Sequence, residues 1–348
     1  MKIIIVFSVL VMLASTAVAS GIERIGTTFS IYQCEYLGMD WKQAYRQTLD
    51  MGWDLIRIGV DWERVEKADG VFDFSDIDWQ LGLAREKGVP VILALGMKTP
   101  RWPEFHVPKW LWEKVKKSNR ADVSEDQVFR KKTLIYISTV ILRYLNDGNI
   151  KYWQVENEAL NRFGEGYKYI GRDFLEEEVK LVRELDTKNR PILLTAATYP
   201  NKFLELFSFL TVKHDPVKEI LQLCDIVGFN IYPTVGKKFM GVQLYFRTTE
   251  KERIRYFHKL QTKVKFAGKE SWIVELQAEP WEPGKLVYLD KEKPKTGRAE
   301  NIVYYVLEFK GYGFNTILLW GIEYWIYREK KYDDTSYLDA VSKVLTLN

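Results

Sequence analysis

The residues best suited to chemistry in this sequence are two glutamates, Glu158 and Glu275, and each follows a short apolar run. Two carboxyl groups that face one another can cleave a glycosidic bond, because one protonates the leaving oxygen while the other attacks or stabilises the anomeric carbon. Glu158 ends residues 152–158, and Glu275 ends residues 272–275. The sequence therefore offers the two carboxyl groups that this chemistry needs.

Other polar residues at the ends of apolar runs could support the pair. Arg57 lies within an apolar run, where an arginine needs an acidic partner. An arginine holds one carboxyl group ionised, whereas an apolar wall raises the pKa of the other. Tyr232 and Asn157 would add hydrogen bonds, and Asn157 would contact the sugar 2-hydroxyl. We predict that Glu158, Glu275, Arg57, Asn157 and Tyr232 form the catalytic set.

The composition suggests how a sugar would be held. The chain has 12 Trp, 20 Tyr and 18 Phe but only 3 His, which disfavours a His-rich metal site or imidazole catalysis. Aromatic faces can stack on sugar rings, and the strand ends and rim loops hold several such side chains. The predicted substrate contacts are Trp320, Asn230, Tyr32, His106, Trp281 and Glu279.

Several of these assignments have an alternative. Glu156 competes with Glu158 on chemistry alone, but it is better explained as a partner of Arg57 or a subsite contact. Glu279 is either a solvated acid or a sugar ligand. Trp102 and Trp325 are predicted in rim loops, as packing anchors or subsites.

The runs that carry these residues alternate with amphipathic stretches after Gly21. Strands are predicted at residues 25–30, 54–60, 90–95, 152–155, 192–196, 226–230, 272–276 and 316–320. Helices are predicted at residues 41–51, 76–87, 124–145, 171–185, 251–266, 298–310 and 335–345, with a further helical region before Cys224. Eight strand–helix units predict an α/β fold, a single (β/α)8 TIM barrel.

A barrel would bring the candidate residues together, because its active site lies at the C-terminal ends of the strands. Glu158 and Glu275 would then end strands four and seven. An open dinucleotide-binding sheet is disfavoured, since no GxGxxG motif follows an early strand, and a P-loop is missing too.

On these residues the sequence resembles the retaining glycoside hydrolases of clan A, most closely the family-5 type, cellulase-like enzymes. The resemblance rests on Asn157-Glu158, Glu275, Arg57 and Tyr232 at the ends of strands four, seven, two and six, and it spans nearly the whole chain after the first 19 residues. Trp320 matches the strand-eight tryptophan, and residues 62–79 are similar to the clan's second βα segment. The resemblance implies that Glu158 is the acid/base and Glu275 the nucleophile.

Two departures separate the chain from family 5. That family places a histidine just before the strand-six tyrosine, where this chain has Asn230, and another after strand three, a role that His106 does not clearly fill. The resemblance thus implies the clan but names neither the family nor the sugar.

The first 19 residues predict a secretion signal. Lys2 precedes an apolar run, which ends in small residues and an A-x-A site at Ala17-Val18-Ala19. We expect residues 20–348 to be the catalytic domain of an exported protein, with an uncleaved membrane anchor as the alternative. Cys34 and Cys224 are expected at opposite ends of the barrel as unpaired thiols.

The remaining expectations concern partners. Lys and Arg total 51 against 47 Asp and Glu, with both signs spread along the chain, so nucleic acid is not an expected partner. We expect a monomer that acts on a β-linked oligo- or polysaccharide and needs no metal or organic cofactor. A transglycosylase with the same site, or a catalytically silent glycan-binding barrel at the cell surface, remain alternatives.

Overall fold

Eight parallel strands close into a barrel in a computed structural model that describes residues 24–115, 121–198, 200 and 215–347. Their order around the barrel is β1-β12-β11-β8-β7-β6-β5-β2. The strands are β1 (Arg24–Phe29), β2 (Leu55–Gly59), β5 (Val91–Leu95), β6 (Ile150–Val155), β7 (Ile192–Ala197), β8 (Ile226–Ile231), β11 (Glu270–Gln277) and β12 (Thr316–Trp320). The predicted TIM barrel is confirmed, with strand bounds within a few residues of those expected.

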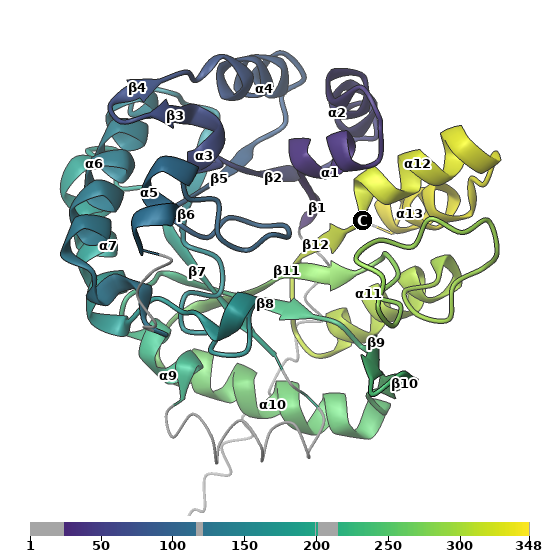
Figure 1. The fold of residues 1–348 in the computed structure, drawn as a ribbon. Helices are drawn as coiled ribbons and strands as arrows, with labels where there is room; N and C mark the ends of the chain where they lie inside the picture. Colours follow the sequence, from purple (N-terminus) through teal and green to yellow (C-terminus); the bar gives the residue numbers. More distant parts are fainter. Residues whose placement is uncertain (1–23, 116–120, 199, 201–214, 348) are drawn as a thin grey trace, which may run out of the picture.

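Helices surround the strands, as Figure 1 shows. The outer helices are α2 (Trp41–Leu49), α4 (Ser75–Glu86), α6 (Gln127–Tyr144), α7 (Arg172–Leu185), α9 (Pro216–Leu221), α10 (Glu250–Phe266), α11 (Ile302–Gly311) and α13 (Ser336–Leu345). Local sequence fixes where some of them begin. Thr249 and Glu252 form a capping box at the start of α10, and the Asp40 carboxylate accepts two backbone N–H groups at the start of α2.

The barrel interior is apolar toward the N-terminal ends of the strands and charged toward their C-terminal ends. Side chains that point inward from six of the strands form one buried apolar cluster: Leu55, Ile92, Leu193, Ile226, Trp272, Val274 and Leu318. Arg57 lies two residues after Leu55 on β2 and therefore points inward as well, nearer the C-terminal ends of the strands. A larger apolar layer fills the space between strands and helices. The polar site thus rests on a closed apolar floor.

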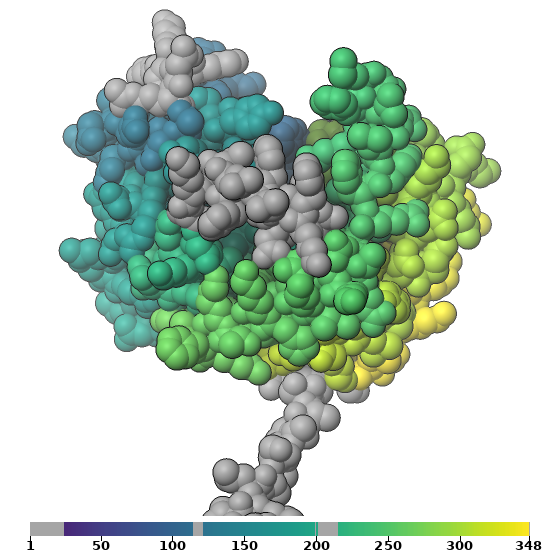
Figure 2. Space-filling view, turned by 90° about the horizontal axis from the view of Figure 1, so that it is seen from below, coloured from purple at the N-terminus to yellow at the C-terminus, as the bar shows by residue number. Residues whose placement is uncertain are grey.

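Several short elements after the strands were not expected from the sequence. They are α1 (Ile31–Tyr36), α3 (Trp62–Val65), α5 (Lys109–Val115), α12 (Ile322–Tyr332), the 3-10 turns η1 (Val123–Glu125), η2 (Glu165–Tyr167) and η3 (Ala299–Asn301), and the hairpins β3 (Glu66–Ala68)–β4 (Val71–Phe72) and β9 (Thr234–Phe239)–β10 (Val242–Arg247). The β9–β10 hairpin follows β8 and stands out as a green protrusion in Figure 2. These elements line the end of the barrel where the candidate residues lie.

One rim assignment is wrong. Trp325 lies within α12 and is fully buried, and its indole N–H donates to the carbonyl of Ala278 at 2.6 Å. It is a packing residue, because a helix that the periodicity did not reveal carries it inward.

The predicted signal segment lies outside the described residues. Among the helices of the described part, none is both long and apolar enough to cross a bilayer. Cys34 and Cys224 are free and buried, as expected.

Candidate active site

Glu275 is held by two donors at the mouth of the barrel. The guanidinium Nη2 of Arg57 donates to Glu275 Oε1 at 2.8 Å, and the phenol of Tyr232 donates to Glu275 Oε2 at 2.6 Å. The ion pair is almost fully shielded from solvent. Burial and the negative charge of Glu275 hold the pKa of Tyr232 well above its usual value, so the phenol stays protonated and can donate. The two donors therefore hold both oxygens of the Glu275 carboxyl group in a fixed orientation.

Arg57 is itself held by three strands. Its Nε donates to Thr28 Oγ1 of β1 at 2.8 Å, and its Nη1 donates to Gln154 Oε1 of β6 at 3.1 Å. Burial lowers the pKa of Arg57, while Glu275 opposes that effect. The buried charge of Arg57 is tolerated because its N–H groups donate to two neutral oxygens and to one carboxylate.

A β-bulge brings Glu275 to this position. The register between β11 and β8 shifts after Ile273, so Glu275 pairs with Asn230. Val274 belongs to the apolar cluster inside the barrel, and regular alternation would turn the next side chain outward. The extra residue redirects Glu275 into the mouth, which is a frequent use of bulges beside active sites.

Glu158 lies opposite, just after β6, with a left-handed backbone φ of 50°. Its Oε1 accepts the Asn230 side-chain amide at 2.6 Å, and its Oε2 accepts the Asn161 amide at 2.8 Å. Burial, followed by repulsion from Glu275, raises the pKa of Glu158 to about 7. At neutral pH this carboxyl group exists in both protonation states, as an acid/base requires.

Asn157 lies beside Glu158 and contacts protein groups. Its Oδ1 accepts from Gln154 Nε2 at 3.2 Å and from Thr195 Oγ1 at 3.1 Å. The residue is half-buried, and these contacts fix its carbonyl and leave the expected sugar contact to its amide nitrogen. Gln154 thereby links Asn157 to Arg57.

The assignment of Glu156 to Arg57 or to a subsite is wrong. β6 ends at Val155, and Glu156 has a φ of 58°, so strand alternation no longer applies to it. Its buried carboxylate accepts the backbone N–H groups of Met97 and Lys98, at 2.7 and 2.6 Å. Burial raises the pKa of Glu156 to about 7, with Glu178 of α7 as its neighbour. Glu156 therefore fixes the backbone just after β5 through these two hydrogen bonds.

Glu279 is a partly buried, ion-paired acid and not a freely solvated one, and its contact with sugar stays a prediction. It pairs with Arg101 at 2.5 Å, and the same guanidinium pairs with Glu323 of α12 at 2.6 Å. Arg101 also lies over the ring of Trp320, at 4.4 Å from the guanidinium carbon to the centroid. Trp320 is buried except for a small part of its surface, so this cluster fixes its orientation at the mouth.

His106 is buried and faces protein groups. Its Nδ1 lies 3.6 Å from Glu63, and its ring stacks on half-buried Tyr32 with centroids 5.2 Å apart. Burial lowers its pKa, but nearby carboxylates, Asp61 first, raise it above the usual value. The structure thus brings Tyr32 and His106 together beside α3, with Tyr32 as the more accessible of the two.

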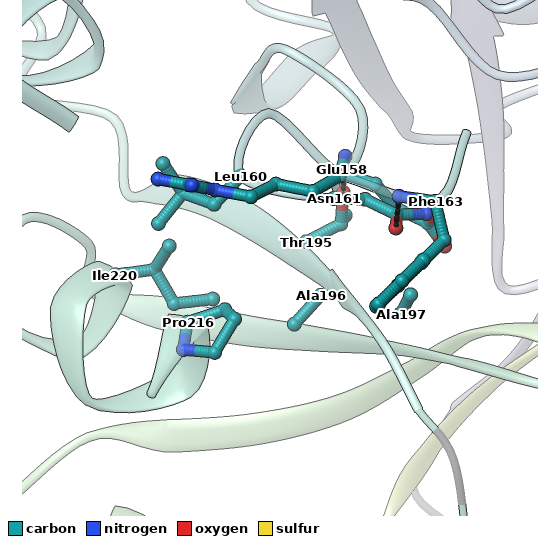
Figure 3. A pocket seen from close by; sticks show the side chains of 10 residues that line it. Glu158, Leu160, Asn161, Phe163, Thr195, Ala196, Ala197, Pro216 and Ile220 are labelled. Atoms are coloured by element: carbon teal, nitrogen blue, oxygen red, sulfur yellow. Dashed lines mark hydrogen bonds between the residues drawn. The ribbon is translucent and has the colours of Figure 1, made fainter. Parts of the chain in front are cut away.

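Two tryptophans remain accessible at the rim. Trp281 packs edge-on against Tyr232, with centroids 5.1 Å apart and 43% of the residue exposed. Trp102 is 47% exposed and precedes a cis proline. A small pocket lies beyond Glu158, where Asn161 and Thr195 face apolar side chains such as Ile220 (Figure 3).

Sequence reasoning missed Lys98, Arg101, Gln154 and Asn161. Gln154 stands on β6 four residues before Glu158, and strand alternation could have placed it on the same inward face, beside Arg57. Lys98, Arg101 and Asn161 lie in loops, where no periodicity predicts direction. No three His, Cys, Asp or Glu side chains gather for a metal ion within the described ranges.

Comparison with known families and proteins gives an independent line of evidence. Residues 33–190 match the family of glycoside hydrolase 42, described as β-galactosidase. The match includes Glu158 but ends before Glu275. The β-galactosidase BgaH of Haloferax lucentense is 26% identical over 133 residues, which are 34% of this chain and 19% of the relative. The chain therefore spans about a fifth of that relative.

Solved structures share the fold over most of the chain. The β-galactosidase from Rahnella sp. R3 superposes with a TM-score of 0.64 and 13% identity, covering 94% of this chain and 56% of the other. Xylanase 10B from Thermotoga petrophila superposes with a TM-score of 0.57 and 14% identity, covering 94% and 95%. At these identities the likeness concerns the barrel fold alone.

Proposed function

We propose that the chain is a retaining glycoside hydrolase that cleaves β-linked glycosides by double displacement. One observation carries the proposal: the Glu275 carboxyl group, held by Arg57 and Tyr232, faces Glu158, whose pKa burial and Glu275 raise to about 7. The reaction needs one carboxyl group fixed for attack and another that gains and loses a proton near neutral pH. A barrel that only bound glycans would gain nothing from this arrangement.

The proposed reaction assigns one role to each carboxyl group. The Glu275 carboxylate attacks the anomeric carbon and forms a glycosyl-enzyme, while Glu158 donates its proton to the leaving oxygen. Glu158 then takes a proton from water as the water displaces Glu275. The negative charge on Glu275 is lost as its bond to carbon forms and returns when the sugar leaves. Tyr232 and Arg57 stabilise that charge before the attack and after the release.

The family match supports β-galactosides as the first substrates to test. The matched segment is described as β-galactosidase, which favours family 42 over the cellulase-like family 5 that the sequence resembles. A xylanase and a β-galactosidase both share the fold, so other β-glycosides belong in the same panel. We also propose, from residues 1–19, that the protein is exported.

The test is hydrolysis of aryl β-glycosides by wild type, E275A, E158A and the control E270A. Glu270 begins the same strand β11 and is exposed, far from the mouth. We expect E275A to lose about 1,000-fold or more in kcat, and E270A to match wild type. E158A should lose far more activity on alkyl or sugar leaving groups than on 2,4-dinitrophenol, which leaves without a proton.

The stereochemistry is tested separately by NMR of the first product. Retention predicts that the β-anomer of the released sugar forms first. A first-formed α-anomer, or a complete panel without turnover by wild type, would overturn the proposal.

A further inference from the structure

Lys98 is a buried cation beside Glu158 that the reaction above does not use. Its side chain is 1% exposed, and its ammonium donates to the backbone carbonyl of Glu158 at 3.1 Å. It also pairs with Glu104 at 2.9 Å and lies over the ring of Phe105, 5.3 Å from its centroid. A lysine is rarely buried unless its charge is compensated. Here the ion pair with Glu104 offsets the desolvation of the ammonium.

The backbone around Lys98 is fixed by Glu156. The Glu156 carboxylate accepts the N–H groups of Met97 and Lys98, at 2.7 and 2.6 Å. Gly96 has a φ of 124°, and a Cβ at that position would lie 2.3 Å from Glu156 Oε1. The end of β5 is therefore fastened to the segment after β6, and it directs the Lys98 side chain back toward Glu158.

The segment that Lys98 supports has an unusual conformation. Glu156 and Glu158 both have positive φ, at 58° and 50°. A left-handed conformation is unfavourable for a residue with a side chain and persists only where the surroundings impose it. The Glu158 backbone N–H donates to Thr195 Oγ1 at 2.7 Å, so the residue is held from β7 at its nitrogen and from Lys98 at its carbonyl.

We infer that Lys98 is a positioning residue for Glu158, which it serves by holding the Glu158 carbonyl and placing a positive charge beside the carboxyl group. This inference rests on the proposed function, because it assigns Lys98 a part in the same reaction. The Glu158 carbonyl accepts two donors, the Lys98 ammonium and the backbone N–H of Asn161 at 3.0 Å. Without the ammonium it keeps only the local turn contact to Asn161, and the link that holds Glu158 to the end of β5 is lost.

The charges around Glu158 make the inference testable. Burial and then Glu275 raise the pKa of Glu158, Lys98 lowers it, and Glu104 raises it. Arg57 of β2 and Tyr232 of β8 also interact electrostatically with Glu158. Lys98 and Glu104 therefore act on the same carboxyl group in opposite directions, although they form one ion pair.

The experiment compares K98M, E104Q and the double variant K98M/E104Q. We expect K98M to raise the pKa of Glu158 by about one unit and E104Q to lower it, since each removes one of two opposite charges. The double variant should have a pKa near that of wild type but keep the activity loss of K98M, because the Glu158 carbonyl still lacks the contact to the ammonium. K98R, which keeps a cation, should restore much of the activity.

Two measurements report the result. The first is the alkaline limb of the pH profile of kcat/KM, on a substrate with a poor leaving group. The second is 13C NMR titration of glutamate δ-carbons, with E158Q identifying the Glu158 signal and thermal unfolding reporting the fold. Equal pKa values in wild type, K98M and E104Q would overturn the inference. K98Q, which also removes the charge of Lys98, takes the place of K98M if K98M does not fold.

The NMR titration also separates this inference from the proposed function. If wild type hydrolyses no glycoside but the pKa of Glu158 moves in opposite directions in the two variants, the proposed function fails while the coupling stands. If wild type is active and depends on Glu158 but neither the titration nor the leaving-group dependence changes in K98M, the role of Lys98 is refuted alone.

Discussion

At the scale of single residues, the charge of Glu275 contributes to the raised pKa of Glu158. The pKa of Glu158 is raised to about 7 by burial and by Glu275. In E275Q the second cause disappears and Arg57 retains its positive charge, so the pKa of Glu158 should fall toward that of an ordinary glutamate. The 13C NMR titration used for Lys98 measures it. E279Q is the control, because Glu279 is paired with Arg101, and an unchanged pKa in E275Q would contradict the electrostatic coupling.

The residue types at strand ends were the part of the site that the sequence predicted best. Glu158, Glu275, Arg57 and Tyr232 follow or interrupt apolar runs, and the structure places them in one hydrogen-bonded mouth. Asn230 was expected to bind sugar, yet it donates to Glu158. Its partner could not be inferred, because the relative position of β8 and β6 depends on closure of the whole barrel.

The geometry of the barrel strands sets the spacing between these side chains. Asn230 and Tyr232 stand two residues apart at the end of β8, which is about 7 Å along an extended chain. Asn230 donates to Glu158 and Tyr232 donates to Glu275, so the end of a single strand provides a hydrogen bond to each carboxyl group. The strands themselves were predictable from their apolar runs. The bulge at Glu275 and the loops with Lys98 and Arg101 were not, because they follow from contacts between segments distant in sequence.

The junction between β5 and β6 gives a prediction for whole elements. In G96A, the new Cβ would lie 2.3 Å from Glu156 Oε1 at a φ of 124°, which favours glycine. We expect a loss of about 2–4 kcal/mol in the free energy of unfolding, together with lower kcat, because the β5 end and Lys98 must shift. Denaturant unfolding and kinetics measure both effects.

A matched glycine substitution provides the control for G96A. Gly82 lies within α4 with open space around its Cβ position, so G82A should be neutral or slightly stabilising, by about 0.5–1 kcal/mol. If G96A proved as stable and as active as G82A, the fastening of β5 to Glu156 would have no energetic importance.

For the whole molecule, the buried carboxyl pair Glu156 and Glu178 links stability to pH. Burial, and then repulsion by Glu156, raises the pKa of Glu178 well above its usual value, and burial raises the pKa of Glu156 to about 7. The folded protein therefore keeps protons that the unfolded chain releases above its ordinary glutamate pKa of 4.5. The contribution of this pair to stability is fully present below that pH and is lost as the pH rises toward the folded-state values, by at most about 1.4 kcal/mol per pH unit for each retained proton.

The substitution E178Q should remove part of this dependence. An amide cannot ionise, and its N–H can donate to Glu156, so E178Q should unfold at higher denaturant concentration than wild type above pH 7 and differ little near pH 4. The control is E176Q, at an exposed position of the same helix α7. Reversible unfolding between pH 4 and 9 measures the difference. If E178Q has the same pH slope as E176Q, or is less stable than wild type at pH 9, Glu178 does not hold its proton in the folded barrel.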